Sequence, residues 1–288
     1  MRENVISALI IVGVLILVGG LWLAYENPAL NPRLNKETYK IIRKWDMPED
    51  LEEISGISYV AENKIACVQD EVGIIFIYNL ETNLVDKKIN FEKSGDYEGV
   101  AIVDSTAYVV VSNGKIYEVS NYLEPTFETR EYQTPFSGKN NIESLTPDLK
   151  NNRLLLAVKD SDPNSKKFKG IYAFDLDSKE VSLKPVYKIP MDDPIFNTGS
   201  KKDRNREFYP SDISINPKNG DVYVLEGKNP RLLIMDKDGK PLRLHILNKE
   251  SFPQPEGVTF APDGTLYISN EGKKGMANIM EVELKDSR

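Results

Sequence analysis

Three glutamates recur at the same position of a short repeated motif. Glu98 begins the segment Glu-Gly-Val-Ala, Glu143 begins Glu-Ser-Leu-Thr, and Glu256 begins Glu-Gly-Val-Thr. Carboxylates gathered around one axis repel one another unless they are protonated or neutralised by a cation. Oxygen donors without histidine or cysteine favour a hard ion, Ca²⁺ ahead of Mg²⁺. The motif therefore predicts a calcium site formed by Glu98, Glu143 and Glu256.

Two further copies of the motif begin with serine instead. Ser55 begins Ser-Gly-Ile-Ser and Ser211 begins Ser-Asp-Ile-Ser, so the ring is not acidic at every position. Asp212 lies one residue out of register and is a weaker candidate. The alternative that each glutamate only caps a solvated turn stays open.

The chain has one cysteine and one histidine, which narrows the chemistry available. Cys67 excludes an internal disulfide and a cysteine-based zinc site, and the alternating run around it predicts a buried core position. His245 alternates with leucines, so we expect it on the exposed face of a strand with Arg243. A Ser-His-Asp triad or a histidine-rich metal centre is therefore not expected, which favours a non-enzymatic role.

The elements that must position the glutamates are strands. The five motif copies begin at residues 55, 98, 143, 211 and 256, and short runs of Val, Ile and Tyr separated by Asn-Gly or Asp-Gly turns follow them. A period near 45 residues built only of strands is typical of a β-propeller blade. The longer third interval contains a complete blade with two polar inserts, residues 160–169 and 191–208, so the count is five blades.

The fifth blade reaches the end of the sequence before its outer strand. Residues 39–45 match the outer-strand pattern of residues 184–190. We predict an all-β, five-bladed propeller with four antiparallel strands per blade, in which the N-terminal strand completes the last blade and hides the sheet edges. The start of each first strand and the end of each second strand then lie at one mouth. The second-strand ends add polar residues there: Asp70, Glu71, Asn113, Asp160, Glu226, Asn270 and Glu271.

An uncharged apolar run occupies residues 5–25. As a helix it would extend about 32 Å, enough to cross a bilayer, with Trp22 and Tyr25 at the interface. A cleaved signal peptide would have a shorter apolar region and an Ala-x-Ala-like site, and neither is present. We predict a transmembrane signal-anchor in residues 1–25, a linker in 26–37 and the propeller in 38–288. A single N-terminal anchor places the propeller on the extracytoplasmic, periplasmic side of the inner membrane.

The formal net charge of −7, with acidic residues spread along the chain, argues against nucleic-acid binding. The negative net charge is compatible with the binding of a cation. The expected partners are the membrane, through the N-terminal helix, and a protein on one face of the propeller.

The order and spacing of four segments resemble the SdiA-regulated (YjiK-like) family of bacterial exported proteins over residues 38–286; the segments are Ser55–Ile57, Tyr97–Val100, Asn141–Leu145 and Pro255–Val258. Residues 255–267 are also similar to an NHL repeat. The resemblance implies a five-bladed propeller, a calcium ion at a shared site, and a membrane or periplasmic location. It carries the metal role onto Glu98, Glu143 and Glu256.

Three functions remain open on the sequence alone. The first is a calcium-binding interaction or sensing module on the outer face of the membrane. The second is a calcium-dependent hydrolase of the phytase or lactonase propeller type, which would need basic residues at the mouth. The third is an assembly partner without bound metal. The candidate basic residues for the second are Lys159, Lys201, Lys202, Arg204, Arg206 and Lys228.

Overall fold

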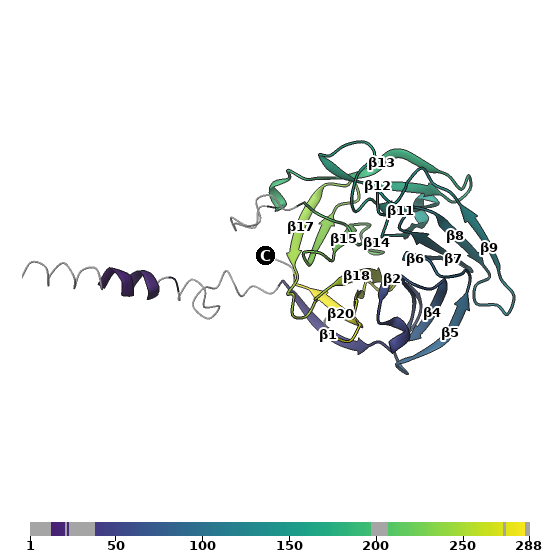
Figure 1. The fold of residues 1–288 in the computed structure, drawn as a ribbon, viewed down its shortest axis with the longest axis horizontal. Helices are drawn as coiled ribbons and strands as arrows, with labels where there is room; N and C mark the ends of the chain where they lie inside the picture. The colour runs from purple at the N-terminus through teal and green to yellow at the C-terminus, as the bar shows by residue number, and fades with distance from the viewer. Residues whose placement is uncertain (1–12, 21, 23–37, 197–206, 273–274, 286–288) are drawn as a thin grey trace, which may run out of the picture. The chain divides into compact units, whose positions relative to one another are not determined.

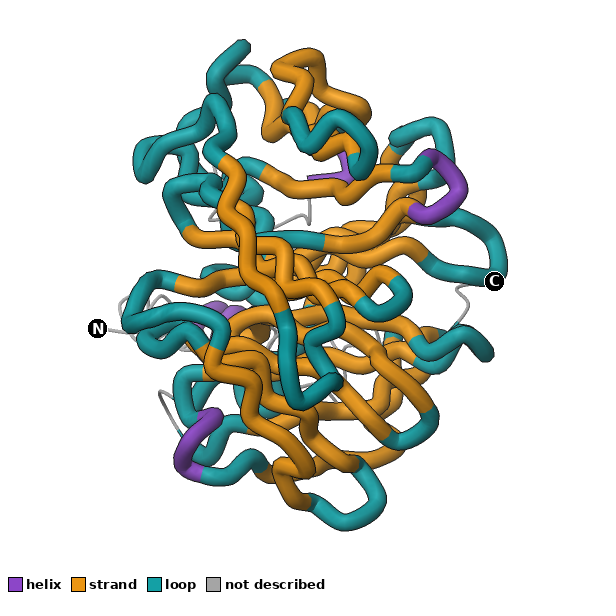
Figure 2. Tube along the Cα trace, turned by 90° about the vertical axis from the view of Figure 1, so that its right-hand side faces the viewer, coloured by secondary structure: helices purple, strands orange, loops and turns teal. Residues whose placement is uncertain are grey.

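Short runs of β-branched and aromatic residues, each ended by a turn, form the twenty strands of the part of the chain that the structure describes. The structure is a computed structural model that describes residues 13–20, 22, 38–196, 207–272 and 275–285. Ile41–Glu283 form one unit, to which the following description applies. Strands dominate this unit, and its helical segments are single 3₁₀ turns (Figure 2), which are Glu49–Leu51, Leu149–Asn151 and Pro194–Phe196.

The strands form five antiparallel sheets of four strands each, and these follow one another around a ring (Figure 1). This confirms the predicted five-bladed propeller. Blade one comprises β2 (Ile54–Ala61), β3 (Lys64–Gln69), β4 (Ile74–Asn79) and β5 (Leu84–Asn90); blade two, β6 (Tyr97–Val103), β7 (Thr106–Val111), β8 (Ile116–Ser120) and β9 (Glu128–Tyr132); blade three, β10 (Thr146–Asp148), β11 (Arg153–Ala157), β12 (Phe168–Asp175) and β13 (Val181–Pro190); blade four, β14 (Asp212–Ile215), β15 (Val222–Glu226), β16 (Arg231–Met235) and β17 (Pro241–Ile246); and blade five, β18 (Pro255–Phe260), β19 (Leu266–Asn270), β20 (Asn278–Leu284) and β1 (Tyr39–Asp46).

The first strands of the five blades contact one another and form the inner wall of the ring. The glycine of the repeated motif is needed for this approach. A Cβ atom on Gly56 would lie 2.6 Å from the Cα atom of Gly99, and a Cβ on Gly99 would lie 2.9 Å from the backbone nitrogen of Leu145. Neighbouring inner strands are therefore too close for a side chain at this position.

The N-terminal strand closes the ring, as predicted. The fourth strand of blade five is β1, which pairs with β20. Trp45 of β1 is buried with Ile54 and Tyr78 of blade one, and its indole Nε1 donates a hydrogen bond to the carbonyl oxygen of Leu80 at 2.7 Å. Trp45 thus joins the last blade to the first.

Cys67 is buried in the core, as predicted, but the prediction for His245 is wrong. Only 2% of His245 is exposed, while Leu242 and Ile246 on the same strand are exposed. β17 is the outermost strand of blade four, and there Leu242 and Ile246 face solvent while His245 is buried, so its apolar residues do not mark the core side. An irregularity in the pairing of β16 with β17 also shifts the register near Leu242.

The buried position of His245 makes stability depend on pH. Burial, and then the charge of Arg243, lowers the pKa of His245 in the folded state. The unfolded chain binds this proton more readily, so stability is lost as pH falls below about 6.5. Replacing His245 by Leu should therefore reduce the stability that is lost between pH 7.5 and 5.5. Thermal unfolding of both proteins at the two pH values measures this, and an unchanged difference would contradict it.

The N-terminal predictions fall largely outside the described residues. Residues 13–20 are helical. The remainder of the predicted 1–25 anchor, apart from residue 22, and the whole of the linker at 26–37 are not described. Within the described residues, no helix has the length and apolar character needed to cross a membrane.

Candidate functional site

Two of the three predicted glutamates occupy β-bulges. Tyr97 pairs with Val111, and Gly99 pairs with Val110, which leaves Glu98 without an opposing residue. Glu256 lies in the same position between Pro255 and Gly257 of β18. A bulge turns the extra side chain away from the regular alternation of the strand. In these two copies, the motif therefore encodes a local distortion that takes the glutamate out of the regular alternation.

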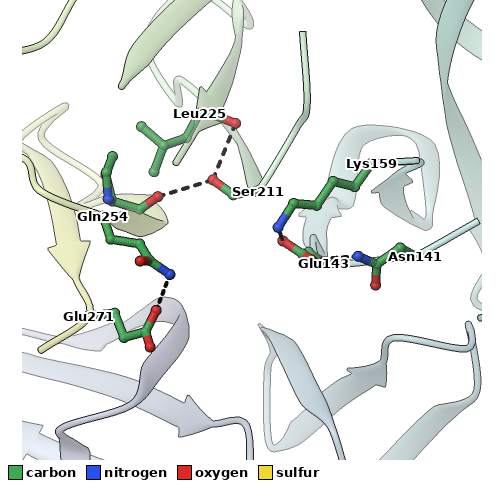
Figure 3. Close-up of polar contacts among 8 residues, drawn as sticks. Asn141, Glu143, Lys159, Ser211, Leu225, Gln254 and Glu271 are labelled. Carbon is green, nitrogen blue, oxygen red and sulfur yellow. Dashed lines mark hydrogen bonds and ion pairs between the residues drawn. The ribbon is translucent and has the colours of Figure 1, made fainter. Parts of the chain in front are cut away.

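Glu143 is positioned differently, because it precedes the short strand β10. Ile142 forms an isolated antiparallel bridge with Val158, and the backbone nitrogen of Lys159 donates to the carbonyl oxygen of Asn141 at 3.0 Å. This pairing places Lys159 beside Glu143, and the two side chains form an ion pair (Figure 3). Asn141 Nδ2 donates to Glu143 Oε1 at 2.8 Å. Both oxygens of Glu143 are therefore engaged.

The three glutamates share one electrostatic neighbourhood. Burial raises the pKa of Glu98, and the charges of Glu143, Asp96 and Glu256 raise it further, while Lys159 lowers it. Burial also raises the pKa of Glu143, against the opposing effect of Lys159. The charges of Glu143 and Glu256 thus both act on Glu98, although the three residues are far apart in sequence.

The basic member of this group is Lys159. Burial lowers the pKa of Lys159, but Glu143, Glu256 and Glu98 outweigh that effect and raise it. Its ammonium group is therefore held in the charged form among the carboxylates. From the sequence, Lys159 was predicted only as a basic residue for the hydrolase alternative. Its place just after the second strand of blade three indicates the end of the ring at which it lies, but not its pairing with Glu143.

The fit of a calcium ion can be judged from these donors. Carboxylate and amide oxygens are the ligands that Ca²⁺ prefers, so the donor types match. In the part of the chain that the structure describes, no three Asp, Glu, His or Cys side chains are grouped so that they could hold a metal ion as they stand. The positive charge next to Glu143 is instead the ammonium of Lys159.

Asp212 has a structural position that the repeat did not reveal. Only 2% of this residue is exposed. Its carboxylate accepts hydrogen bonds from the backbone nitrogens of Ile213 at 2.8 Å and Val258 at 2.7 Å, and also from that of Leu145. These donors belong to blades three, four and five. Burial raises the pKa of Asp212 and the backbone donors oppose the rise. Asp212 occupies the place of the motif glycine, and this exception was its sequence signal.

A second group of carboxylates lies where blades one and five meet. Burial raises the pKa of Asp70 to about 6, with further contributions from Glu53 and Glu271. Asp70 Oδ1 is buried and has no hydrogen-bond partner within the described residues. Gln254 Nε2 donates to Glu271 Oε2 (Figure 3). The glutamine thus holds Glu271 in place near Asp70.

Other polar residues that were predicted at the mouth form contacts with neighbouring side chains and backbone groups. Glu226 is fully buried and forms an ion pair with Arg231, which also donates to the carbonyl oxygen of Glu207 at 3.0 Å. Lys228 lies over the ring of Tyr209, with its ammonium 4.1 Å from the ring centroid. The basic residues at 201, 202, 204 and 206 lie outside the described residues. The set expected for a hydrolase is therefore represented here only by Lys159 and Lys228.

The described residues form a five-bladed β-propeller in which Glu143 forms an ion pair with Lys159 near Glu98 and Glu256. This chain belongs to the SdiA-regulated family, whose sequence pattern matches residues 34–274. The family resemblance seen in the sequence is thereby confirmed. No curated protein is significantly similar to the chain.

Solved structures with the same architecture have distant sequences. The glutaminyl cyclase of Myxococcus xanthus is 14% identical, with a TM-score of 0.60, and the match covers 87% of this chain and 97% of that one. A PQQ-bound aldose sugar dehydrogenase from Streptomyces coelicolor is 12% identical, with a TM-score of 0.53 and coverage of 86% and 98%. A streptogramin B lyase is 13% identical, with a TM-score of 0.51 and coverage of 86% and 98%. The structural likeness shows a shared fold. At sequence identities this low, it carries no activity over to this chain.

Proposed function

We propose that this protein is a membrane-anchored, extracytoplasmic calcium-binding propeller that acts as an interaction or sensing module. The observation that supports it is the set of three glutamates, from three blades, that share one electrostatic neighbourhood. Their mutual repulsion is unfavourable in a partly buried site, and a divalent cation would relieve it. When bound, Ca²⁺ would supply that charge, and Glu98, Glu143 and Glu256 would hold it.

The surrounding residues support this role by fixing the carboxylates in place. The bulges orient Glu98 and Glu256, and Asn141 orients Glu143 through its hydrogen bond. Because the ligands come from different blades, cation binding would act on the packing between blades. A propeller face whose blades are drawn together in this way is a suitable surface for reporting calcium to a protein partner.

The proposed location rests on the uncharged apolar run at residues 5–25. Its length and interfacial aromatic residues are those of a single-pass anchor. The absence of a nucleophile–base pair in the sequence favours an interaction role over a hydrolytic one. A chain that remains in the aqueous fraction when the cell membranes are sedimented would contradict the anchor.

Calorimetric titration of the full-length chain with CaCl₂ tests the calcium site. Combined substitution of Glu98 and Glu256 by Gln should weaken binding at least about tenfold, because calcium affinity follows the number of charged ligands. The control replaces Glu62 and Glu81 by Gln, which changes the net charge equally at two exposed positions. The control should bind as the wild type does. Equal binding by both double variants, or none by the wild type, would refute the site.

A further inference from the structure

The end of the ring opposite the glutamates carries a repeated apolar position. Each blade is an antiparallel sheet in which the first turn and the third turn lie at the far end from the start of the first strand. We call this end of the ring the lower face. The residue four places after the start of each motif copy is apolar in all five blades and partly exposed near this face; these residues are Tyr59, Ile102, Pro147, Ile215 and Phe260.

Hydrogen bonds between blades hold this position in register. In blade one, the backbone nitrogen of Tyr59 donates to Thr259 Oγ1 of blade five at 3.0 Å. In blade two, the backbone nitrogen of Ile102 donates to Ser58 Oγ of blade one at 3.3 Å. The same position thus makes the same contact with the preceding blade in both cases, and the repeat places its apolar side chains around the axis of the ring.

Exposed leucines extend the apolar surface outward across three neighbouring blades. Leu84 begins β5, Leu123 lies in the turn before β9, and Leu149 lies in the turn after β10, all at the lower face. Their exposed fractions are 64%, 46% and 62%. The ammonium of Lys87, on the same strand as Leu84, donates to the carbonyl oxygen of Leu123 and so joins blades one and two there. Apolar side chains gathered on one face, rather than scattered singly, are typical of an interaction surface.

The turns around the leucines of blades one and two are acidic. Four exposed carboxylates lie in these turns, and they are Glu62, Glu81, Asp104 and Glu124. The lysines of the same region are engaged, because Lys64 pairs with Asp86 at 3.0 Å and Lys87 donates to the carbonyl oxygen of Leu123. The lower face of these blades therefore combines apolar side chains with a negative border, an arrangement of apolar centre and charged rim that is common in protein interfaces.

We propose that the lower face of blades one to three binds a basic amphipathic segment of a partner protein, with apolar side chains against the leucines and lysine or arginine beside the carboxylates. This inference rests on the interaction role proposed above, but it does not depend on the calcium site. The charge of the border decides between the occupants. It attracts a basic segment, whereas it repels an anionic lipid surface and the same face of a second copy.

A helical peptide of leucine and lysine, with its leucines along one face, is the probe for this surface. Fluorescence anisotropy of the labelled peptide measures its binding to the full-length chain in EDTA, at one fixed NaCl concentration, after thermal unfolding has shown that each variant is folded. Combined replacement of Leu84, Leu123 and Leu149 by Ser should weaken binding at least about tenfold, because each substitution removes a large apolar contact.

The matched control replaces three apolar residues of similar exposure on the outer strands β13 and β17 by Ser. These are Leu183, Leu242 and Ile246, which are 43%, 44% and 53% exposed. The control variant should bind the peptide within about twofold of the wild type, because its substitutions lie outside the proposed surface.

The acidic border is tested separately. Glu81→Gln combined with Glu124→Gln should weaken binding about three- to tenfold and reduce its dependence on salt, because exposed charge pairs are modest and screened. The control combines Glu49→Gln with Glu250→Gln, two exposed positions at the other end of the ring, and should bind as the wild type does. A second peptide with glutamate in place of lysine should not bind measurably.

The outcomes separate this inference from the calcium proposal. If the leucine variant binds the peptide as the wild type does, or if the glutamate peptide binds as tightly as the lysine peptide, the inference is overturned. It is also overturned if the leucine substitutions instead abolish binding to phosphatidylglycerol nanodiscs, or self-association in the ultracentrifuge, because the face would then belong to lipid or to a second copy. Since the peptide titrations contain EDTA, a wild type that binds no CaCl₂ removes the calcium site and leaves the docking surface standing.

Discussion

Deletion of residues 38–46 is expected to abolish the cooperative fold of the propeller rather than to trim one strand from it. These residues form β1, the fourth strand of blade five. Without it, β20 becomes an exposed edge, and the core between blades five and one loses Trp45. The loss of a buried tryptophan alone costs about 3–5 kcal/mol, a large part of the stability of a typical domain. Circular dichroism and thermal unfolding measure the result.

Single substitutions in the same strand provide the controls. Trp45→Ala should destabilise the protein by about 3–5 kcal/mol, because it leaves a cavity and removes the hydrogen bond to Leu80. Arg43→Ala and Lys44→Ala alter exposed side chains and should change stability by less than about 0.5 kcal/mol. A deletion variant that unfolds cooperatively near the wild-type temperature would show that the ring does not need β1.

Replacement of Asp212 by Asn should produce the second large loss of stability. The carboxylate accepts hydrogen bonds from Ile213 and Val258 on different oxygens, and from Leu145 as well. An amide places an NH₂ group against one of these backbone donors, and the buried N–H loses its acceptor. The expected cost is about 2–4 kcal/mol, which lowers the midpoint of thermal unfolding by roughly 4–16 °C.

The control for this prediction is Asp238→Asn. Asp238 lies in an exposed turn and forms an ion pair with Lys237 on the surface, so its replacement should have little effect. The prediction also separates two roles for Asp212. A variant that unfolds at the wild-type temperature but binds calcium more weakly would show that Asp212 acts as a ligand and not as a connection between blades.

The blade count and the closing strand could be predicted because each depends on a pattern within a short segment of the sequence. The motif recurs once per blade, and residues 39–45 carry the pattern of an outer strand although they stand at the other end of the chain. The same rotational repeat predicts that Glu98, Glu143 and Glu256 lie at one mouth, and the charges of Glu143 and Glu256 do act on Glu98.

The predictions failed, or were not made, for residues whose environment is formed by segments distant in the sequence. His245 follows an alternation that predicts exposure, but on the outermost strand of blade four the exposed side carries Leu242 and Ile246 and the buried side carries His245. The pairing of Lys159 with Glu143 depends on the isolated bridge between Ile142 and Val158, which is too short to be seen in the sequence. The role of Asp212 depends on backbone groups from two other blades. None of these partners can be identified from a residue's own segment.

The closure of the ring by β1 has a consequence for the order in which the propeller is made. Blades one to four each consist of consecutive strands and can assemble as they are synthesised. Blade five needs the first strand of the domain to be made, which must remain unpaired, with its tryptophan exposed, until the last strand has been produced. Contacts between such distant segments form slowly, because a long stretch of chain must be closed into a loop. The joining of the two ends is therefore the step at which newly made chains are most exposed to aggregation.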